Sequence, residues 1–448
     1  MTGSDAGARP QIRLAYHGPL GDVPAALMKR LLSRAPADVR KVRDATRTIL
    51  DLVREQGDGA LKEFARKFDG VALTELEVPR EDWERSLAEL EPGVRAGLER
   101  AARNIEAFHR AQIPDEVVLE VEPGVRLGRR FVPLGAVGVY APGGRAAYPS
   151  SVLMGAVPAR AVGVREVVVC SPPGPDGLPS PVVMAAAAVA GATRLFAVGG
   201  AGAVGAMAYG TRSIPRCHAI VGPGNRWVLE AKRQVAGEVL IDSPAGPSEV
   251  LVLSEAGAAR AELLASELVA QAEHDPDAAV VFVTPSPEQL EAVHAALAVQ
   301  VARTPRREVV EAALATSGAL LLAPDRDAML DFAERYAAEH LSLCTIDPRR
   351  DLERLRTAGT VFLGEAATVA FGDYMTGANH VLPTAGTARS FSGLSALNFM
   401  RSYTWQEISP TGAARLAEPV AILAEAEGLP AHAAAARMRA GGEAPAGG

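Results

Sequence analysis

A glutamine and a histidine, Gln271 and His274, stand one helical turn apart at the end of the stretch ELVAQAEHDPDA, residues 267–278. Side chains at this spacing lie on one face of a helix. An amide oxygen and an imidazole placed side by side can bind a metal ion. The alternative is an ordinary helix end before the turn at Asp275-Pro276, because both residue types are common in last turns. Taken alone, this stretch favours the ordinary helix end.

Polar clusters around histidine recur elsewhere in the chain. Four of the eight histidines lie beside carboxylates or amides, in the groups Gln271–His274, Glu339–His340, Asp373–His380 and Glu427–His432. The other four lie in helical, tail or strand contexts typical of structural or surface residues, and they are His17, His109, His218 and His294. A site rich in oxygen and nitrogen ligands without thiolate suits zinc or a similar divalent ion.

Three glycine-rich turns each follow a strand pattern, and they are VYAPGGR (139–145), GAGAVG (200–205) and VGPGNRW (221–227). The second fits the G-x-G-x-x-G dinucleotide fingerprint, but the next strand ends in Gly222 without the acidic residue that would hold a ribose. Chance matches and ordinary tight turns are the alternatives in a chain with 43 glycines. Together the three turns predict exposed backbone amides along one sheet edge, where phosphate-bearing ligands bind.

Composition limits the class of protein. The 448 residues suffice for two or more domains. A net charge of −7 without a basic run argues against a nucleic-acid partner. The cysteines Cys170, Cys217 and Cys344 form no disulfide pattern, and the sequence shows no signal peptide and no apolar stretch long enough to span a membrane. We therefore expect a cytoplasmic protein with a small-molecule substrate and no membrane contact.

The pattern of elements predicts an α/β protein. Residues 36–111 repeat apolar positions at helical spacing with breaks at Gly70 and Pro92, and residues 116–134 alternate as a β-hairpin does. From residue 136, apolar strands alternate with helices, which indicates parallel sheets covered on both faces. The expected strands are VGVYA, EVVVC, RLFAV, HAIV, EVLID, EVLVLS, AVVFVT, GALLLA, LSLCT and GTVFLG. After Ser392 we expect an irregular and then helical C-terminal appendage.

Seven of these stretches together resemble the bacterial histidinol dehydrogenases. They are GVYAPGGRAAYPSSVLM, GPGNRWVLEAKRQVAG, IDSPAGPSEVLVLSE, QAEHDPDA, AEHLSL, FGDYMTGANHVLPTAGTAR and EGLPAH, and they occur in the order of the family. The resemblance implies an α/β fold of two incomplete Rossmann-like domains with a helical N-terminal segment and a small C-terminal tail, in an intertwined homodimer. The implied division is an arm (1–35), a first domain (36–139 with 249–392), a second, NAD-binding domain (140–248) and a dimer-crossing tail (393–448).

The same resemblance implies the activity and the site. The reaction would oxidise L-histidinol through L-histidinaldehyde to L-histidine with two NAD molecules, the last steps of histidine biosynthesis, in an enzyme with one zinc ion per subunit. The implied zinc ligands are Gln271, His274, Asp373 and His432, and the implied catalytic pair is Glu339 and His340. The implied substrate contacts are Ser248, Gln271, His274, His340, Asp373, Glu427 and His432, the implied NAD contacts are Tyr140 and Asn225, and the tail is expected to reach the partner subunit's site.

The sequence departs from the family pattern at three positions. Gly202 stands where the family has a glutamine that contacts NAD, and Ala338 and Ala378 replace prolines. Without the hydrogen bond that this glutamine makes, we expect NAD to bind about threefold to tenfold more weakly. Gly202→Gln is expected to restore the affinity for NAD. The alanines affect loop stiffness more than chemistry.

The residue types also suggest a mechanism. Oxidation of an alcohol to an acid needs two hydride transfers and one water. The imidazole of His340 can take the alcohol proton and the carboxylate of Glu339 can activate the water. Two alternatives remain: a paralogous zinc- and NAD-dependent enzyme for another polar alcohol, and a binding protein without redox activity.

Overall fold

The structure is a computed structural model that describes residues 12–34, 39–143, 147–243 and 246–440. It divides into two compact units. Unit 1 comprises residues 1–111 with 135–399, and unit 2 comprises residues 112–134 with 400–448. Among the helices of the described residues, none has both the length and the apolar character that crossing a membrane requires.

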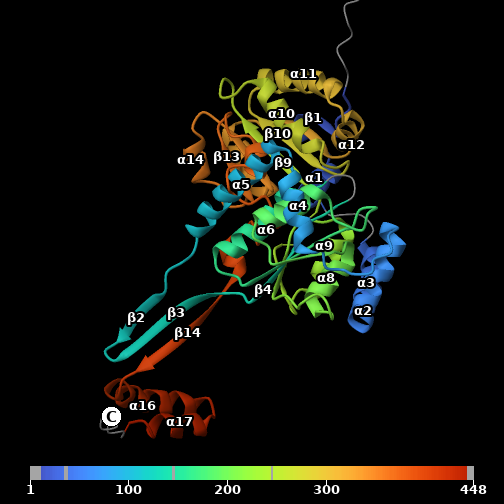
Figure 1. The fold of residues 1–448 in the computed structure, drawn as a ribbon. Helices are drawn as coiled ribbons and strands as arrows, with labels where there is room; N and C mark the ends of the chain where they lie inside the picture. The colour runs from blue at the N-terminus through green and yellow to red at the C-terminus, as the bar shows by residue number, and fades with distance from the viewer. Residues whose placement is uncertain (1–11, 35–38, 144–146, 244–245, 441–448) are drawn as a thin grey trace, which may run out of the picture. The chain divides into compact units, whose positions relative to one another are not determined.

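The first sheet of unit 1 is parallel and has the predicted apolar strands (Figure 1). Its five strands, in spatial order, are β6 (Arg194–Ala197), β5 (Glu166–Ser171), β4 (Ala136–Tyr140), β7 (Ala219–Val221) and β8 (Leu240–Ile241). The chain runs outward from β4 to β6, then returns to β7 on the other side of β4. Ligands of open α/β sheets bind where the strand order reverses in this way, at the carboxyl ends of the strands.

Helices cover both faces of this sheet. On one face, α2 (Val39–Gln56), α3 (Asp58–Phe64), α8 (Gly200–Tyr209) and α9 (Arg226–Val235) share a buried core with the strands. On the other face lie α6 (Pro149–Ala161) and α7 (Pro181–Val189), with α4 (Arg80–Glu89) against α7 and α5 (Pro92–Arg110) against α6. The predicted breaks are confirmed: Gly70 ends a short π-helical turn at a φ of 73°, and Pro92 opens α5.

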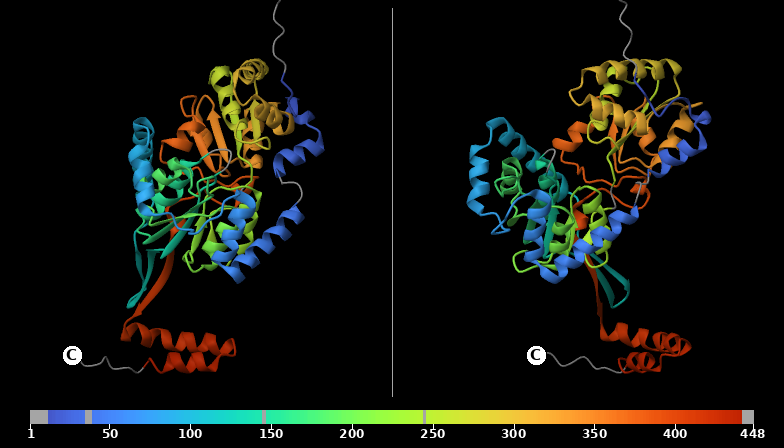
Figure 2. Two further views of the ribbon diagram at one scale, coloured as in Figure 1. Left: turned by 45° about the vertical axis from the view of Figure 1, so that its right-hand side comes forward. Right: turned by 90° about the vertical axis from the view of Figure 1, so that its right-hand side faces the viewer.

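The second sheet of unit 1 is also parallel. Its six strands, in spatial order, are β1 (Tyr16–Pro19), β11 (Gly318–Leu322), β10 (Ala279–Thr284), β9 (Glu249–Ser254), β12 (His340–Cys344) and β13 (Thr360–Leu363). One face carries α10 (Ala261–Ala272), α11 (Pro287–Arg303) and α12 (Arg307–Ser317), and the other carries α1 (Ala25–Ser33) and α13 (Arg326–Tyr336) (Figure 2).

Short elements complete unit 1. They are the helices α14 (Pro348–Leu352) and α15 (Val369–Tyr374), the π-helical turn η2 (Ala65–Asp69), and the 3₁₀ turns η1 (Leu20–Asp22), η3 (Thr387–Arg389) and η4 (Ala396–Phe399).

Unit 2 combines an antiparallel sheet with two helices. Its strands, in spatial order, are β14 (Met400–Ile408), β3 (Val125–Pro133) and β2 (Val117–Glu122), and its helices are α16 (Pro410–Ala426) and α17 (Pro430–Arg437). The predicted hairpin is confirmed as β2 and β3, with Gly124 in the turn at a φ of 81°.

The structure corrects two expectations about the elements. The irregular segment expected after Ser392 ends before Met400, where strand β14 begins and pairs with β3 over its full length. Strand β1 was not predicted. Leu50 of α2 and Leu61 of α3 join the core around α8, whereas Asn104 of α5 donates a hydrogen bond to the carbonyl oxygen of Met375 at 2.7 Å. The predicted division into four segments stays a prediction.

Candidate active site

The predicted catalytic pair lies at the start of β12. Glu339 directly precedes the strand and His340 is its first residue, in register with Val250 of β9 and Thr360 of β13. The interior position of β12 in the sheet buries both side chains, at 5% and 4% exposure. Buried ionisable groups need partners, so their neighbours define the site.

The imidazole of His340 is oriented by the main chain. Its Nδ1 lies 3.0 Å from the carbonyl oxygen of Glu249 and 3.4 Å from Oε2 of Glu339. Because a carbonyl oxygen can only accept a hydrogen bond, Nδ1 carries the hydrogen and Nε2 of a neutral ring carries the lone pair. Nε2 lies 3.6 Å from Oδ1 of Asp373 and has no hydrogen-bond partner among the described residues. This nitrogen is therefore placed to accept a proton.

The pKa of His340 depends on the two carboxylates beside it, those of Glu339 and Asp373. Burial lowers the pKa of His340, but the negative charges of Glu339 and Asp373 outweigh it and hold this pKa well above its usual value. Burial raises the pKa of Asp373, but the ring of His340 and the charges of His380 and His274 outweigh it, so this pKa is lowered. Asp373 is thus an ionised carboxylate among three imidazoles.

Two helices bring the other predicted residues to Asp373. Asp373 lies in α15, and Nδ1 of His380 contacts its carbonyl oxygen at 3.0 Å. Glu267 of α10 accepts a hydrogen bond from the N–H of Val369, the first residue of α15, at 2.9 Å. This bond fixes the start of α15 to α10, which carries Gln271 in its last turn and ends at Ala272, two residues before His274.

Gln271 is buried at the end of α10 without a partner. Gln271 is only 1% exposed, and neither its amide oxygen nor its amide nitrogen has a hydrogen-bond partner among the described residues. An unsatisfied buried amide costs about 1–3 kcal/mol, so such a group signals a missing ligand. The amide oxygen of Gln271, the imidazole of His274 and the carboxylate of Asp373 fit a zinc ion by donor type. The ordinary helix end remains the alternative for His274, which is exposed.

Glu249 supports the pair through its main chain. Its N–H donates to Oε2 of Glu339 at 2.7 Å, and its carbonyl oxygen accepts from His340. Ser248, a predicted substrate contact, is the residue before it and is partly exposed. Residues 248–249 therefore border the catalytic pair at the amino end of β9.

The side chain of Glu249 is held by a buried arginine from the N-terminal segment. The guanidinium of Arg34 forms an ion pair with Glu249, stacks 3.8 Å from the ring centre of Tyr336 and donates to the Tyr336 carbonyl oxygen at 2.8 Å. Burial raises the pKa of Glu249 to about 7, with Arg34 opposing the rise and the charge of Glu339 adding to it.

The sequence interpretation missed both residues of this ion pair. A glutamate opening the apolar strand EVLVLS was the available signal for Glu249, whereas Arg34 resembles any surface arginine.

The predicted NAD contacts flank the strand-order reversal of the five-stranded sheet. Tyr140 ends β4 and Asn225 follows β7, and these two strands are neighbours. Burial raises the pKa of Tyr140 to about 12, and its hydroxyl accepts from the N–H of Gly200 at 3.1 Å. Asn225 is exposed and caps α9 by accepting from the N–H groups of Trp227 and Val228. All three glycine-rich stretches follow strand carboxyl ends, but residues 200–205 form the start of α8 and not a turn, and Gly144 and Arg145 lie outside the described residues.

Gly202 does not lie in a glycine-rich turn, contrary to the expectation from the sequence. It lies in α8 and is buried, and a Cβ there would come within 3.1 Å of Phe64 and 3.3 Å of Leu61. The space that a glutamine side chain would need is filled by α3.

The remaining predicted residues belong to unit 2. Glu427 caps the C-terminus of α16, and His432 lies in the first turn of α17, where its N–H donates to the carbonyl oxygen of Leu429 at 3.0 Å. Both side chains are exposed. Their roles stay predictions.

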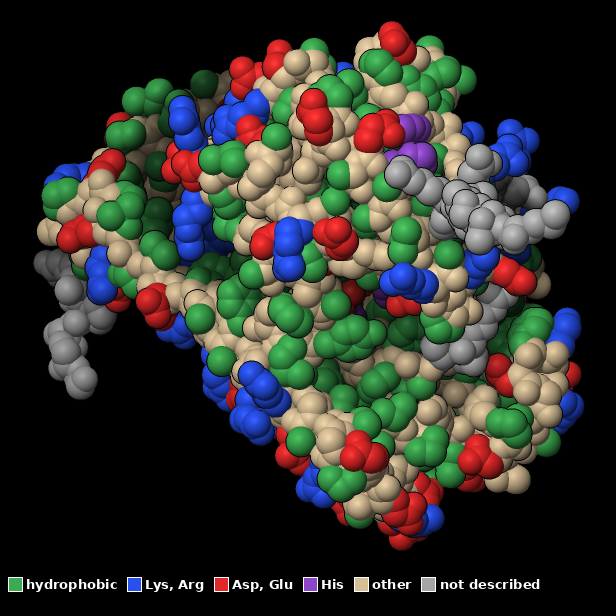
Figure 3. Space-filling model, turned by 90° about the horizontal axis from the view of Figure 1, so that it is seen from above, with side chains coloured by type: hydrophobic (Ala, Val, Ile, Leu, Met, Phe, Trp, Pro, Cys, Tyr) green, Lys and Arg blue, Asp and Glu red, His purple; other side chains and the backbone are tan. Residues whose placement is uncertain are grey.

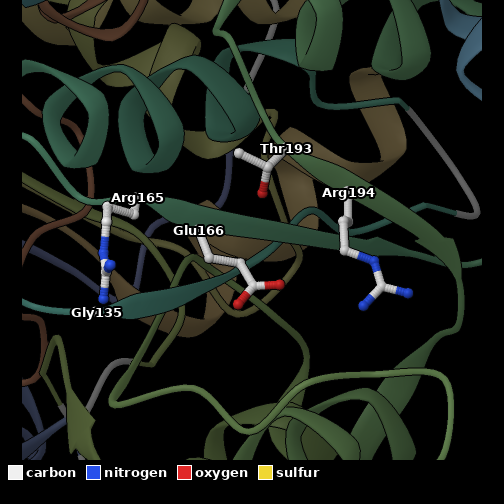
Figure 4. Close-up of a pocket in the computed structure, with 5 residues that line it drawn as sticks. All are labelled: Gly135, Arg165, Glu166, Thr193 and Arg194. Carbon is white, nitrogen blue, oxygen red and sulfur yellow. The ribbon is translucent and has the colours of Figure 1, made fainter.

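A pocket elsewhere in unit 1 is not this site. Figure 4 shows Glu166 between Arg165 and Arg194, at the amino ends of β5 and β6. These residues line a cavity of ≈ 340 Å³. That edge is opposite to the glycine-rich turns. Arg194 is also already paired with Glu77 at 2.6 Å.

Comparison with known proteins identifies the relatives of the chain. Residues 32–440 match the histidinol dehydrogenase family. A histidinol dehydrogenase of Methanosarcina mazei is 47% identical over 423 residues, which cover 94% of this chain and 97% of the relative. A histidinol dehydrogenase of Haloarcula marismortui is 49% identical over 405 residues, which cover 90% of this chain and 94% of the relative.

A solved structure agrees with the sequence relatives. The crystal structure of histidinol dehydrogenase from Elizabethkingia anophelis superimposes with a TM-score of 0.90 at 32% identity, over 96% of this chain and 98% of that one. The α/β fold expected from the sequence is thereby confirmed.

Proposed function

Since the chain belongs to the histidinol dehydrogenase family, we propose that it oxidises L-histidinol through L-histidinaldehyde to L-histidine with two NAD molecules, using Glu339 and His340. The enzyme is an NAD-dependent oxidoreductase, and histidinol is its substrate. The observation that carries the proposed site is the unpartnered Nε2 of His340 beside the carboxylate of Asp373.

The two catalytic residues divide the proton transfers. With Nδ1 held by the Glu249 carbonyl oxygen, Nε2 of His340 takes the hydroxyl proton of the alcohol while the hydride leaves for the nicotinamide. Oε2 of Glu339 is occupied by the N–H of Glu249, so Oε1 is the oxygen that activates water to attack the aldehyde. After His340 has released its first proton to solvent, the hydrate gives a hydride to a second NAD and a hydroxyl proton to Nε2 of His340, and the acid is formed.

Zinc fits the polar groups around Asp373. The ligands would be Gln271, His274 and Asp373, with His432 of the partner subunit. A bound zinc ion would supply a Lewis-acid centre that orients nitrogen donors of the substrate. The unpartnered buried amide of Gln271 and the lowered pKa of Asp373 support this assignment.

NAD is assigned to the carboxyl edge of the five-stranded sheet. The backbone N–H groups of the glycine-rich turns would bind its phosphates, and Tyr140 and Asn225 would contact the rest of the cofactor. Asn225 uses its carboxamide oxygen as the cap of α9, which leaves its NH₂ group for a ligand. The position of both residues beside the reversal of strand order supports this assignment.

A homodimer with shared active sites would cover the apolar surface of unit 2. Strand β2 exposes apolar side chains on both faces, and α16 exposes Ile422 at 58% and Leu423 at 67%. Isolated subunits rarely expose so much apolar surface in one small unit. We assign the protein to the cytoplasm because its three cysteines are free and buried.

The activity is tested by supplying the zinc-loaded protein with L-histidinol and NAD and following NADH absorbance. We expect two NADH per L-histidinol consumed, slower turnover of other amino alcohols, and no turnover by His340→Asn. The variant His218→Asn, which changes an exposed histidine beside β7, is the matched control and keeps full activity. Faster oxidation of another amino alcohol would show that the chain serves a different substrate.

A further inference from the structure

Two histidines and a glutamate converge on the surface beside the six-stranded sheet. His17 lies in β1, and Glu291 and His294 lie one turn apart in α11. Nε2 of His17 is 3.2 Å from Oε1 of Glu291, and the ring centres of the two histidines are 4.6 Å apart. One ligand atom from each residue lies within 4.8 Å of the others. Histidine side chains appear beside acidic ones on the face shown in Figure 3.

The fold fixes these three residues by packing that does not involve them. Strand β1 is held at the sheet edge by pairing with β11, where His17 is in register with Leu320. Helix α11 is held by Val293 and Leu297, which are buried in the core of the same sheet. The exposed side of the strand and the exposed side of the helix therefore meet with both backbones already in place.

The donor set suits a zinc-type ion. Two imidazoles and one carboxylate are the ligands of open zinc sites, in which water completes the coordination. Ligands about 2.0–2.1 Å from zinc at a tetrahedral angle lie roughly 3.3–3.4 Å apart. The 3.2 Å between His17 and Glu291 is close to that value, and His294 would approach by a side-chain rotation.

The lowered pKa of the His294 imidazole favours metal binding. Burial and the neighbouring His17 lower the pKa of His294, with Glu291 opposing them. A neutral ring offers its lone pair to a metal, whereas two protonated rings at this distance would repel each other. A simple ion pair between His17 and Glu291 is the competing explanation, and at such exposure it contributes little.

We propose that His17, Glu291 and His294 form a second metal site, for zinc or a similar nitrogen-preferring divalent ion, that ties the N-terminal strand to α11. Imidazole ligands select such ions over magnesium and calcium, which prefer oxygen. The site is separate from Gln271, His274 and Asp373 and shares no residue with them.

Equilibrium dialysis of the full chain against zinc chloride tests the proposal. We expect wild type to bind one more zinc per chain than His17→Gln or His294→Gln, and to keep this difference with magnesium in excess. The difference is read as well in the His274→Asn background, so it does not depend on whether the active site holds zinc. His218→Asn, an exposed histidine next to the other sheet, is the matched control and binds as wild type does.

Hydrogen exchange gives a second readout at the strand itself. Zinc should slow exchange of the β1 amides at least threefold in wild type and leave them unchanged in His294→Gln. Equal zinc stoichiometry in wild type and both variants would overturn the proposal. So would equal slowing of exchange in wild type and His294→Gln, since both results mean that the cluster is only an ion pair.

Discussion

At the scale of single residues, the active site is defined by polar atoms that lack a partner in the chain. The sequence predicted that Gln271 and His274 share a helix face, but α10 ends at Ala272 and His274 lies in the turn after it, because the chain bends before Asp275-Pro276. It could not predict that the amide of Gln271 is buried and unpaired, since burial depends on how α10 packs on the sheet. The same limit applies to Nε2 of His340, whose neighbour Asp373 is distant in sequence.

The first prediction concerns the buried amide of Gln271. In metal-free protein, Gln271→Leu should raise the free energy of unfolding by about 1–3 kcal/mol, because it removes an unsatisfied buried polar group at similar volume. The same change should abolish zinc retention and activity. Urea unfolding after chelation, together with metal analysis, measures both effects. Loss of stability in the metal-free variant would mean that the amide has a partner and is not waiting for a ligand.

The second prediction separates the two catalytic residues. Glu339→Gln should spare the first hydride transfer and slow aldehyde oxidation by about 10²–10⁴-fold, whereas His340→Asn should slow both steps. Single-turnover kinetics started from L-histidinol and from L-histidinaldehyde distinguish the two steps. Equal losses in both steps for Glu339→Gln would contradict its role in activating water.

The third prediction reverses an expectation drawn from the sequence alone. Because Leu61 and Phe64 fill the space beside Gly202, Gly202→Gln should lower the free energy of unfolding by about 1–3 kcal/mol without improving the KM for NAD. Gly202→Ala is the control, because about 1 kcal/mol of helix propensity offsets its smaller overlap. A lower KM for NAD in a stable Gly202→Gln protein would restore the original interpretation.

At the scale of elements, apolar periodicity predicted what local sequence encodes. Both parallel sheets and the hairpin of residues 116–134 were expected, since buried strands are continuous apolar runs and hairpins alternate around a turn. Strands β1 and β14 were missed because their sequences, YHGP and MRSYTWQEI, are short or mostly exposed. Pairing with β11 and β3 makes them strands, and that pairing is a long-range property.

The fourth prediction concerns the contact between Arg34, at the end of α1, and Glu249 of β9. Arg34→Met should lower the free energy of unfolding by about 3–5 kcal/mol, because it leaves the buried carboxylate of Glu249 without its counter-charge. Adding Glu249→Gln should recover most of the lost stability, because it removes the unpaired charge. A second substitution restores stability in this way only if the two side chains interact directly. Arg30→Met, one turn earlier and exposed, is the control and should change stability by less than about 1 kcal/mol. Urea unfolding of wild type, Arg34→Met, Glu249→Gln, the double variant and Arg30→Met measures the coupling, and simple additivity of the losses in the two single variants would contradict it.

At the scale of the whole molecule, the two sheets of unit 1 carry their predicted site residues at opposite strand ends. The proposed NAD contacts follow the carboxyl ends of β4 and β7, whereas the catalytic pair and Ser248 lie at the amino ends of β12 and β9. Sequence patterns predicted both sheets, but only the fold shows which edge of each carries polar groups. On the face shown in Figure 3, acidic and basic side chains are interspersed, in keeping with a small-molecule substrate.

The fifth prediction tests whether the active sites are shared between subunits. Glu427 and His432 lie exposed in unit 2, together with the apolar surface that we assign to the dimer. If each site combines His340 of one chain with His432 of the partner subunit, then His340→Asn and His432→Asn are both inactive as homodimers. A heterodimer of the two variants places one intact His340 opposite one intact His432, and places both lesions in the other site. It should therefore have about half the wild-type activity per dimer, as two-fold symmetry requires. Co-expression with two different affinity tags and sequential purification isolates the heterodimer. An inactive heterodimer would mean that each chain completes its own site, because every chain then carries one lesion.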